Sequence, residues 1–180
     1  MSNIKPSLWI VNELESLIMN NNVVNFLDLA CGKGRHSIYL ASRNMQVVSI
    51  DIKFDDLKTF SNYNNVKTIC FDLENEYKWP LKKQFDVVLV INYLYRKNFT
   101  KILQLVKPNG YLIYETFAFG NEKYGSPKNP KFLLEKEELK YLINKKEFKI
   151  IKYYHGLVTK PVHSIKQRCV AKKLPHEMGQ

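Results

Sequence analysis

Apolar segments of strand length alternate with segments of helical periodicity along most of the chain. This alternation is typical of repeated βαβ units around a mostly parallel sheet. The predicted helices are residues 6–19, 35–43, 55–60, 99–106 and 135–144. The predicted strands are residues 23–29, 46–50, 66–71, 85–93, 111–117, 148–154 and 164–171, the last two forming an antiparallel hairpin at the sheet edge. We therefore expect a doubly wound α/β fold with three α/β/α layers.

The 180 residues suit a single domain, and no linker or repeat divides them. We expect residues 1–20 to form an N-terminal helix or lid, 21–117 a ligand-binding half and 118–180 a substrate-side half. The segment GNEKYGSPKNP, residues 120–130, is rich in Gly, Pro and Asn and predicts an irregular loop. Its length is typical of a functional loop rather than a simple connection.

The composition is that of a globular protein, with 45% hydrophobic and 25% charged residues. No apolar run reaches the ~18 residues that a membrane span requires. Residues 1–17 lack the apolar core and cleavage site of a signal peptide, so a cytoplasmic location is expected. The three cysteines are widely spaced and the four histidines are scattered, so neither a disulfide framework nor a metal site is predicted.

The formal net charge of +11 is uneven along the chain. Residues 121–180 carry 14 basic and 6 acidic side chains. A positive field of this kind attracts nucleic acids and anionic substrates. A solvated, lysine-rich surface explains the same excess, and we favour this second interpretation.

The segment FLDLACGKGRHS, residues 26–37, joins a predicted strand to a predicted helix through a Gly-x-Gly turn. Glycines there let a ligand approach the backbone N–H groups, so nucleotide-like molecules bind at such turns. The phosphate-loop pattern G-x-x-x-x-G-K-[ST] is absent, which argues against nucleotide hydrolysis. The dinucleotide pattern G-x-G-x-x-G is met only in part, because Ser37 stands at its third glycine.

Two acids, one on each side of this turn, narrow the choice of ligand. Asp28 would repel a pyrophosphate but attract an ammonium or sulfonium group. Asp51 follows the next strand, where an acid accepts hydrogen bonds from ribose hydroxyls. S-adenosylmethionine, an adenosine with a positively charged amino-acid tail, fits both acids. Helix capping by Asp28 is the alternative, but an N-cap directly precedes the first helical turn and Asp28 does not.

The sequence Asp28-Leu-Ala-Cys-Gly-Lys-Gly34 resembles the first motif of the class I S-adenosylmethionine-dependent methyltransferases. Ala30 departs from the glycine that is frequent in that motif. The resemblance implies a Rossmann-like seven-stranded fold, with Asp51 on the ribose, Asp72 and Leu73 on the adenine edge and Asn92 facing the methionine end. The cofactor-binding residues that it implies are Asp28, Ala30, Cys31, Gly32, Gly34, Asp51, Ile52, Asp72, Leu73 and Asn92.

The resemblance extends over nearly the whole chain. Residues 6–9, 85–96, 113–134 and 167–171 are similar to a group of small bacterial methyltransferases of unassigned substrate, which is distantly similar to tellurite-resistance methyltransferases. Within that pattern Tyr93 and Glu115 are candidate catalytic residues. Core packing is the alternative for Tyr93, and a structural hydrogen bond is the alternative for Glu115.

Aromatic and basic residues outside the first motif are candidates for the substrate side. These candidates are Trp9, Tyr95, Arg96, Tyr124 and Arg168. The aromatic rings would help to close a water-free pocket, and packing is their alternative role. Arg168 lies within a predicted strand and therefore needs an acid such as Glu115, or an anionic substrate, as its partner.

The sequence thus predicts methyl transfer from S-adenosylmethionine to an unidentified small-molecule acceptor by direct in-line displacement. A nucleic-acid methyltransferase is a first alternative, but the residues after the fourth strand, Asn92-Tyr-Leu-Tyr95, lack the Asn/Asp-Pro-Pro-Tyr set of amino-methylating enzymes. A non-catalytic S-adenosylmethionine-binding module is a second alternative. A nicotinamide-dependent oxidoreductase is disfavoured, because Asp28 would oppose the pyrophosphate.

Overall fold

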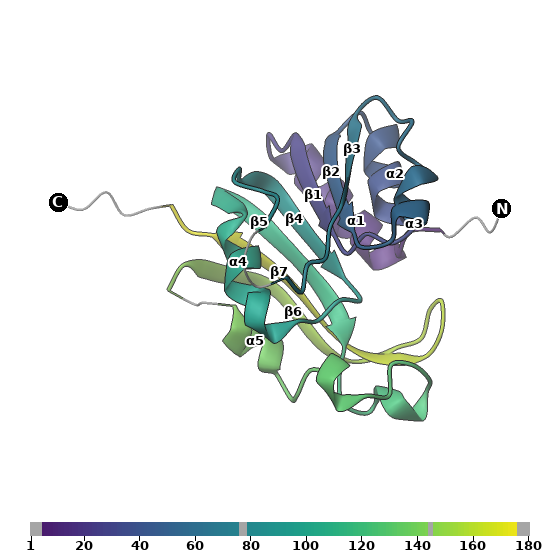
Figure 1. Cartoon of the computed structure of the whole chain (residues 1–180). Helices are drawn as coiled ribbons and strands as arrows, with labels where there is room; N and C mark the ends of the chain where they lie inside the picture. The colour runs from purple at the N-terminus through teal and green to yellow at the C-terminus, as the bar shows by residue number, and fades with distance from the viewer. Residues whose placement is uncertain (1–4, 76–78, 144–145, 176–180) are drawn as a thin grey trace.

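Figure 1 shows the chain as a computed structural model, which describes residues 5–75, 79–143 and 146–175. The α-helices are α1 (Leu8–Asn20), α2 (Arg35–Ser42), α3 (Phe54–Lys58), α4 (Phe99–Gln104) and α5 (Glu138–Leu142). The 3-10 helices are η1 (Arg96–Asn98), η2 (Asn121–Lys123) and η3 (Pro130–Phe132). The strands are β1 (Asn25–Leu29), β2 (Gln46–Asp51), β3 (Val66–Cys70), β4 (Phe85–Ile91), β5 (Val106–Phe117), β6 (Phe148–Val158) and β7 (Ser164–Lys173). Within the described ranges, no helix combines the length and apolarity needed to cross a membrane.

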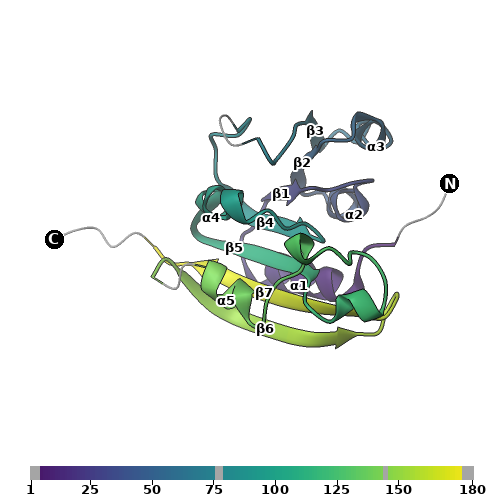
Figure 2. The same ribbon diagram turned by 60° about the horizontal axis from the view of Figure 1, so that its bottom comes forward.

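The strands form one seven-stranded sheet in the order β3-β2-β1-β4-β5-β7-β6, and Figure 2 shows β3 and β6 at its two edges. Strands β1 to β5 run parallel, whereas β7 is antiparallel to both β5 and β6. The predicted Rossmann-like sheet with an antiparallel edge hairpin is confirmed. Strand β1 lies between β2 and β4, and ligands of such sheets bind beyond the carboxyl ends of the strands at this reversal of strand order.

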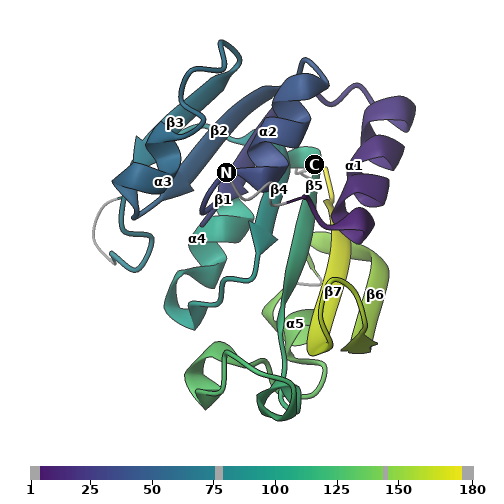
Figure 3. The same ribbon diagram turned by 90° about the vertical axis from the view of Figure 1, so that its right-hand side faces the viewer.

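Helices cover both faces of the sheet, as Figures 1 and 3 show. On one face α1, α2 and α3 contribute Ile10, Leu40 and Leu57 to a buried apolar cluster. On the other face α4 and α5 contribute Ile102 and Leu139 to a second buried cluster. Burial of these apolar stripes stabilises the three-layer arrangement predicted from the sequence.

The segment between β5 and α5 is more regular than its composition predicts. Residues 120–130 contain η2 and the start of η3 instead of a wholly irregular loop. The buried Asn121 orders this segment, because its side-chain oxygen accepts a hydrogen bond from the backbone N–H of Ile165 at 3.2 Å. Figure 3 shows the segment beyond the end of β5, beside the β6–β7 hairpin. Helix α5 is shorter than the predicted 135–144, because Glu137 takes a left-handed conformation (φ 58°) before it.

Candidate active site

The turn after β1 is built from three left-handed residues. Ala30, Gly32 and Gly34 have φ angles of 52°, 55° and 69°. Ala30 fits this region less well than glycine, which explains why glycine is frequent at this position in the motif it resembles. The backbone N–H of Cys31 donates to the carbonyl of Ile50 at 3.1 Å and fixes the turn against β2.

The two glycines of the turn face different surroundings. A Cβ on Gly32 would meet no heavy atom within 4 Å, so its backbone is open to a ligand. A Cβ on Gly34 would lie 2.5 Å from the ring of Phe60, a residue of the apolar core. Gly34 is therefore required for packing, and the sequence-based assignment of Gly34 to ligand contact is not supported by its position.

A cavity of about 320 Å³ lies beside this turn, at the carboxyl ends of β1 and β4. Its lining residues are Asp28, Ala30, Cys31, Gly32, Lys33, Arg35, His36, Asp56, Ile91 and Asn92. Five of the residues assigned to the cofactor from the sequence, Asp28, Ala30, Cys31, Gly32 and Asn92, are thus brought together. Burial raises the pKa of the Cys31 thiol, so the nucleophilic thiolate is disfavoured there.

Asp28 is the buried acid of the cavity, with 1% of its surface exposed. Its Oδ2 accepts a hydrogen bond from Ser37 Oγ at 2.7 Å, and Ser37 Oγ accepts one from Ser49 Oγ at 2.8 Å. Burial raises the pKa of Asp28 from 3.8 to about 6, although the hydrogen bond from Ser37 and the positive charge of Arg35 oppose this change. Asp28 therefore contacts the first turn of α2 through Ser37 and also faces the cavity.

Asp51 connects the end of β2 to the turn. Its Oδ2 accepts from the backbone N–H of Gly32 at 2.8 Å, and its Oδ1 accepts from that of Lys53 at 3.0 Å. Each carboxylate oxygen has a second lone pair, which leaves acceptor capacity for ribose hydroxyls. The neighbouring Ile52 is 60% exposed, as an apolar surface for a nucleoside would be.

The residues assigned to the adenine edge lie after β3. Asp72 Oδ1 accepts from the backbone N–H of Glu74 at 2.9 Å, whereas the Leu73 side chain is buried in the core. Tyr93 belongs to this side of the site, because the negative charges of Glu74 and Asp72 act on its hydroxyl. Burial, followed by these charges, raises the pKa of Tyr93, and its buried Oη has no hydrogen-bond partner among the described residues. A role as general base is disfavoured for such a phenol.

Glu115 is the centre of a buried charge cluster. Its Oε1 accepts from Lys166 Nζ and its Oε2 from Arg168 Nε, both at 2.6 Å. Glu115 is 1% exposed and Lys166 is 8% exposed. Both carboxylate oxygens are occupied by cations of β7, so this geometry favours the structural alternative for Glu115 over the catalytic one. The predicted acidic partner of Arg168 is confirmed as Glu115.

Lys166 is a functional candidate that the sequence-based prediction missed. Its ammonium group also donates to Asn92 Oδ1 at 2.7 Å and so reaches the rim of the cavity. Lys166 and Arg168 are two residues apart in β7 and share one face of the strand, opposite Glu115 in β5. The spacing of Lys166 and Arg168 was therefore visible in the sequence. Recognising Lys166 as a partner of Glu115 also required the pairing of β5 with β7, which the structure provides.

Arg96 does not face a substrate site as predicted. Its guanidinium donates to both carboxylate oxygens of Glu138, at 2.6 and 2.9 Å, and to the carbonyls of Lys131 and Leu133. These bonds use most of its donors to hold the segment before α5 against η1. Tyr95, just before Arg96, is half-buried.

The aromatic residues predicted to close the pocket, Trp9 and Tyr124, lie in different parts of the fold. Trp9 of α1 stacks against Arg168, with the guanidinium carbon 5.0 Å from the ring centroid, and lines a separate cavity against β6. Tyr124 lies in the segment after β5, where it is 47% exposed and meets His163 edge to face. Of the two, only Tyr124 has the exposed position that a mobile rim residue requires.

His36 and Arg35 begin α2 and line the cavity. His36 Nε2 accepts from the backbone N–H of Ser7 at 3.3 Å, which ties α1 to the site. Burial lowers the pKa of His36 to about 3, so the imidazole is neutral at pH 7 and carries its proton on Nδ1. Arg35 therefore supplies positive charge to this wall of the cavity, whereas His36 does not.

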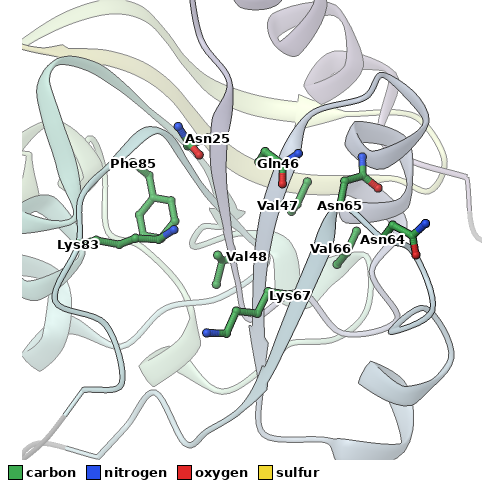
Figure 4. A pocket seen from close by; sticks show the side chains of 10 residues that line it. All are labelled: Asn25, Gln46, Val47, Val48, Asn64, Asn65, Val66, Lys67, Lys83 and Phe85. Atoms are coloured by element: carbon green, nitrogen blue, oxygen red, sulfur yellow. The ribbon is translucent and has the colours of Figure 1, made fainter.

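A second cavity, of about 250 Å³, lies at the opposite end of the strands (Figure 4). Asn25, Gln46, Val66 and Phe85 line it at the amino ends of β1 to β4. It contains none of the residues predicted for the site, and ligands of parallel α/β sheets bind at the carboxyl ends. The cavity beside Asp28 is therefore the candidate active site.

Comparison with known proteins shows which part of the chain has relatives. Residues 26–110, which run from β1 into β5 and include the turn, Asp51, Asp72 and Asn92, match the family model described as a methyltransferase domain. The putative methyltransferase YqeM of Bacillus subtilis (strain 168) is 31% identical over 105 residues, which cover 51% of this chain and 42% of the relative.

Two solved structures show how far the fold is shared. TehB from Haemophilus influenzae superposes with a TM-score of 0.74 at 16% identity, over 91% of this chain and 62% of TehB. Magnesium protoporphyrin IX methyltransferase (ChlM) from Synechocystis PCC 6803, solved with bound SAH, has a TM-score of 0.68 at 16% identity, over 92% of this chain and 81% of ChlM. This chain spans less than two thirds of the length of YqeM and of TehB. Residues 26–110 therefore match a methyltransferase domain, and the seven-stranded sheet around them is a fold that this chain shares with TehB and ChlM.

Proposed function

We propose that this protein transfers a methyl group from S-adenosylmethionine to a small-molecule acceptor by direct in-line displacement. The observation that carries the proposal is the arrangement of two carboxylates around one left-handed turn. Asp28 faces the cavity, and Asp51 holds the N–H of Gly32 at 2.8 Å. The open side of Gly32 lies between them, where a bound ligand would touch backbone.

The residues present fit the methyl donor group by group. Asp51 would accept hydrogen bonds from the ribose, the exposed Ile52 would cover one face of the adenine, and Asp28 would neutralise the ammonium group of the tail. When bound, S-adenosylmethionine supplies a methyl group that is already activated by a sulfonium sulfur. The protein then contributes mainly orientation and exclusion of water, which together account for large rate effects in other enzymes.

The chemistry of the acceptor is inferred from three candidate bases among the described residues, Tyr93, Glu115 and His36. Tyr93 has a raised pKa, Glu115 is held by Lys166 and Arg168, and His36 presents a protonated Nδ1. This arrangement suits an acceptor whose lone pair is available at neutral pH without proton removal. A soft nucleophile such as a thiolate belongs to this class.

A small molecule is preferred to a nucleic acid because part of the positive charge is neutralised within the fold. Lys152 pairs with Glu13, Lys140 with Glu137, and Arg168 with Glu115. ChlM, which shares the fold, acts by its name on a small molecule, magnesium protoporphyrin IX. Both observations support the proposal of a small acceptor.

Calorimetric titration with S-adenosylmethionine and with NAD tests the cofactor. The wild-type protein is expected to bind the first and not the second. Asp51→Ala is expected to weaken S-adenosylmethionine by about 1.5–3 kcal/mol, the range for hydrogen bonds to a charged group. Thermal unfolding of the variant provides the control for folding. Binding of NAD alone, or an unchanged affinity in Asp51→Ala, would contradict the proposal.

The two glycines of the turn provide a matched pair of variants. Gly32→Ala is expected to weaken S-adenosylmethionine, because the new methyl group would occupy the open space beside the turn, and to destabilise the fold only by the strain of alanine at φ 55°. Gly34→Ala is expected to lower the free energy of unfolding by about 1–3 kcal/mol, because its methyl group would overlap the Phe60 ring. Chemical denaturation and ligand titration of both variants measure the two effects. Equal losses of stability would contradict the assignment of different roles.

A further inference from the structure

Asn92 has a left-handed backbone conformation at the rim of the cavity. It follows β4 with a left-handed φ of 59°, and its backbone N–H donates to the carbonyl of Glu115 at 2.7 Å. Its side chain lines the cavity together with Asp28 and Arg35. Asparagine is among the few non-glycine residues that adopt this conformation readily, and the conformation fixes the direction in which its side chain leaves the backbone.

Lys166 fixes the orientation of the Asn92 amide. A lysine ammonium group has donors and no acceptor, so the Asn92 atom 2.7 Å from Nζ is the oxygen. The amide nitrogen is then turned away from Lys166, and no group among the described residues accepts its hydrogens. Lys166 itself is held by Glu115 Oε1 at 2.6 Å, and its Nζ lies 4.7 Å from the centre of the Phe117 ring.

We propose that Lys166 is a positioning residue that keeps the N–H groups of Asn92 directed at the cavity, where they bind the carboxylate of the methyl donor's amino-acid tail. The inference rests on the proposed function. It specifies which end of the site binds the carboxylate and which end binds the ammonium group. Arg35 lines the same cavity and adds positive charge to it. Asp28 then pairs with the ammonium group. The carboxylate and the ammonium group of the tail thus each have a complementary partner.

Asn92→Asp distinguishes this orientation from its reverse. Aspartate still accepts from Lys166, so the charge cluster keeps its contacts, but aspartate has no N–H to offer and carries a negative charge. The variant is expected to weaken S-adenosylmethionine at least about tenfold, the loss typical of a hydrogen bond to a charged group. Decarboxylated S-adenosylmethionine, which keeps the ammonium group, is expected to bind Asn92→Asp as well as, or better than, the wild type.

Lys166→Met tests the positioning role itself. Release of the amide is expected to weaken S-adenosylmethionine several-fold and leave its decarboxylated analogue unchanged, and Lys166→Arg is expected to recover part of the loss. Lys152→Met is the matched control, because Lys152 pairs with Glu13 on α1 and does not line the cavity. Lys152→Met removes one positive charge, as Lys166→Met does. It is expected to leave the affinities for S-adenosylmethionine and for its decarboxylated analogue unchanged.

The measurements are titration calorimetry with both ligands and thermal unfolding of every variant. Tighter binding of S-adenosylmethionine to Asn92→Asp would mean that the ammonium group faces Asn92, and unchanged binding would mean that this side chain is not used. Either result overturns the inference and leaves the proposed function intact. A wild-type protein that binds neither ligand would overturn both.

Discussion

Replacing Glu115 with alanine is expected to lower the free energy of unfolding by about 3–5 kcal/mol, the range for breaking a buried ion pair from one side. The carboxylate lies 2.6 Å from both Lys166 Nζ and Arg168 Nε, and it is almost completely buried. Its removal leaves two cations without their counter-charge at the junction of β5 and β7. Urea denaturation followed by circular dichroism measures this loss.

Two further variants separate the structural role of Glu115 from a catalytic one. Combining Glu115→Leu with Lys166→Met and Arg168→Met is expected to restore much of the stability lost in Glu115→Ala, because apolar replacement of a whole buried charge cluster is often neutral. Glu115→Gln keeps the shape and an acceptor oxygen. If Glu115 were a general base, Glu115→Gln would lower kcat by about 10²–10⁴-fold, whereas a purely structural role predicts a loss of stability without a comparable loss of kcat. A stable Glu115→Ala protein would contradict the structural assignment.

The parts of the site that follow from local sequence were predicted. Strand β1, the turn and helix α2 are continuous in the chain, so the left-handed glycines could be expected from Gly-x-Gly between an apolar strand and an amphipathic segment. Asp51 could be placed because β2 follows in the same βαβ unit and pairs with β1 in parallel. The hydrogen bond from the Gly32 N–H to Asp51 is a direct product of this unit.

Apart from the pair of Arg168 with Glu115, the parts that depend on distant pairing were not predicted. Lys166 reaches Asn92 and Glu115 only because β7 returns antiparallel beside β5, in the register that pairs Glu115 with Arg168. Arg96 was assigned to the substrate, since nothing in its own neighbourhood shows that Glu138 will lie opposite it. Sequence periodicity gives the face of a strand, but it does not give the partner across the sheet.

Replacing Asp28 with asparagine is expected to weaken S-adenosylmethionine by about 2–4 kcal/mol, because an ion pair at about 4 Å is worth about 4 kcal/mol at the dielectric typical of protein sites. The same variant is expected to raise the stability of the ligand-free protein at pH 8. Asparagine has nearly the same shape and can still accept the hydrogen bond from Ser37 Oγ. It lacks the charge whose burial is unfavourable.

The stability gain has a defined dependence on pH. The folded protein holds the Asp28 proton more tightly than the unfolded chain, since the pKa rises from 3.8 to about 6 on folding. Each unit of such a shift corresponds to about 1.4 kcal/mol. The contribution of Asp28 to stability is therefore lost as the pH rises from about 4 to about 6, and the advantage of Asp28→Asn is expected to grow over this range and stay constant above it.

Ligand binding decides between the two roles of Asp28. A cationic ligand needs the ionised carboxylate, so the wild-type affinity for S-adenosylmethionine is expected to fall below about pH 6, where Asp28 takes up its proton. The affinity of Asp28→Asn is expected not to show this fall below about pH 6. Capping of α2 through Ser37 predicts the same change in stability but no change in affinity. Equal affinity of the wild type and Asp28→Asn for S-adenosylmethionine at pH 8 would therefore assign Asp28 to the helix. A weaker affinity of Asp28→Asn only at pH values where Asp28 is ionised in the wild type would assign Asp28 to the methyl donor.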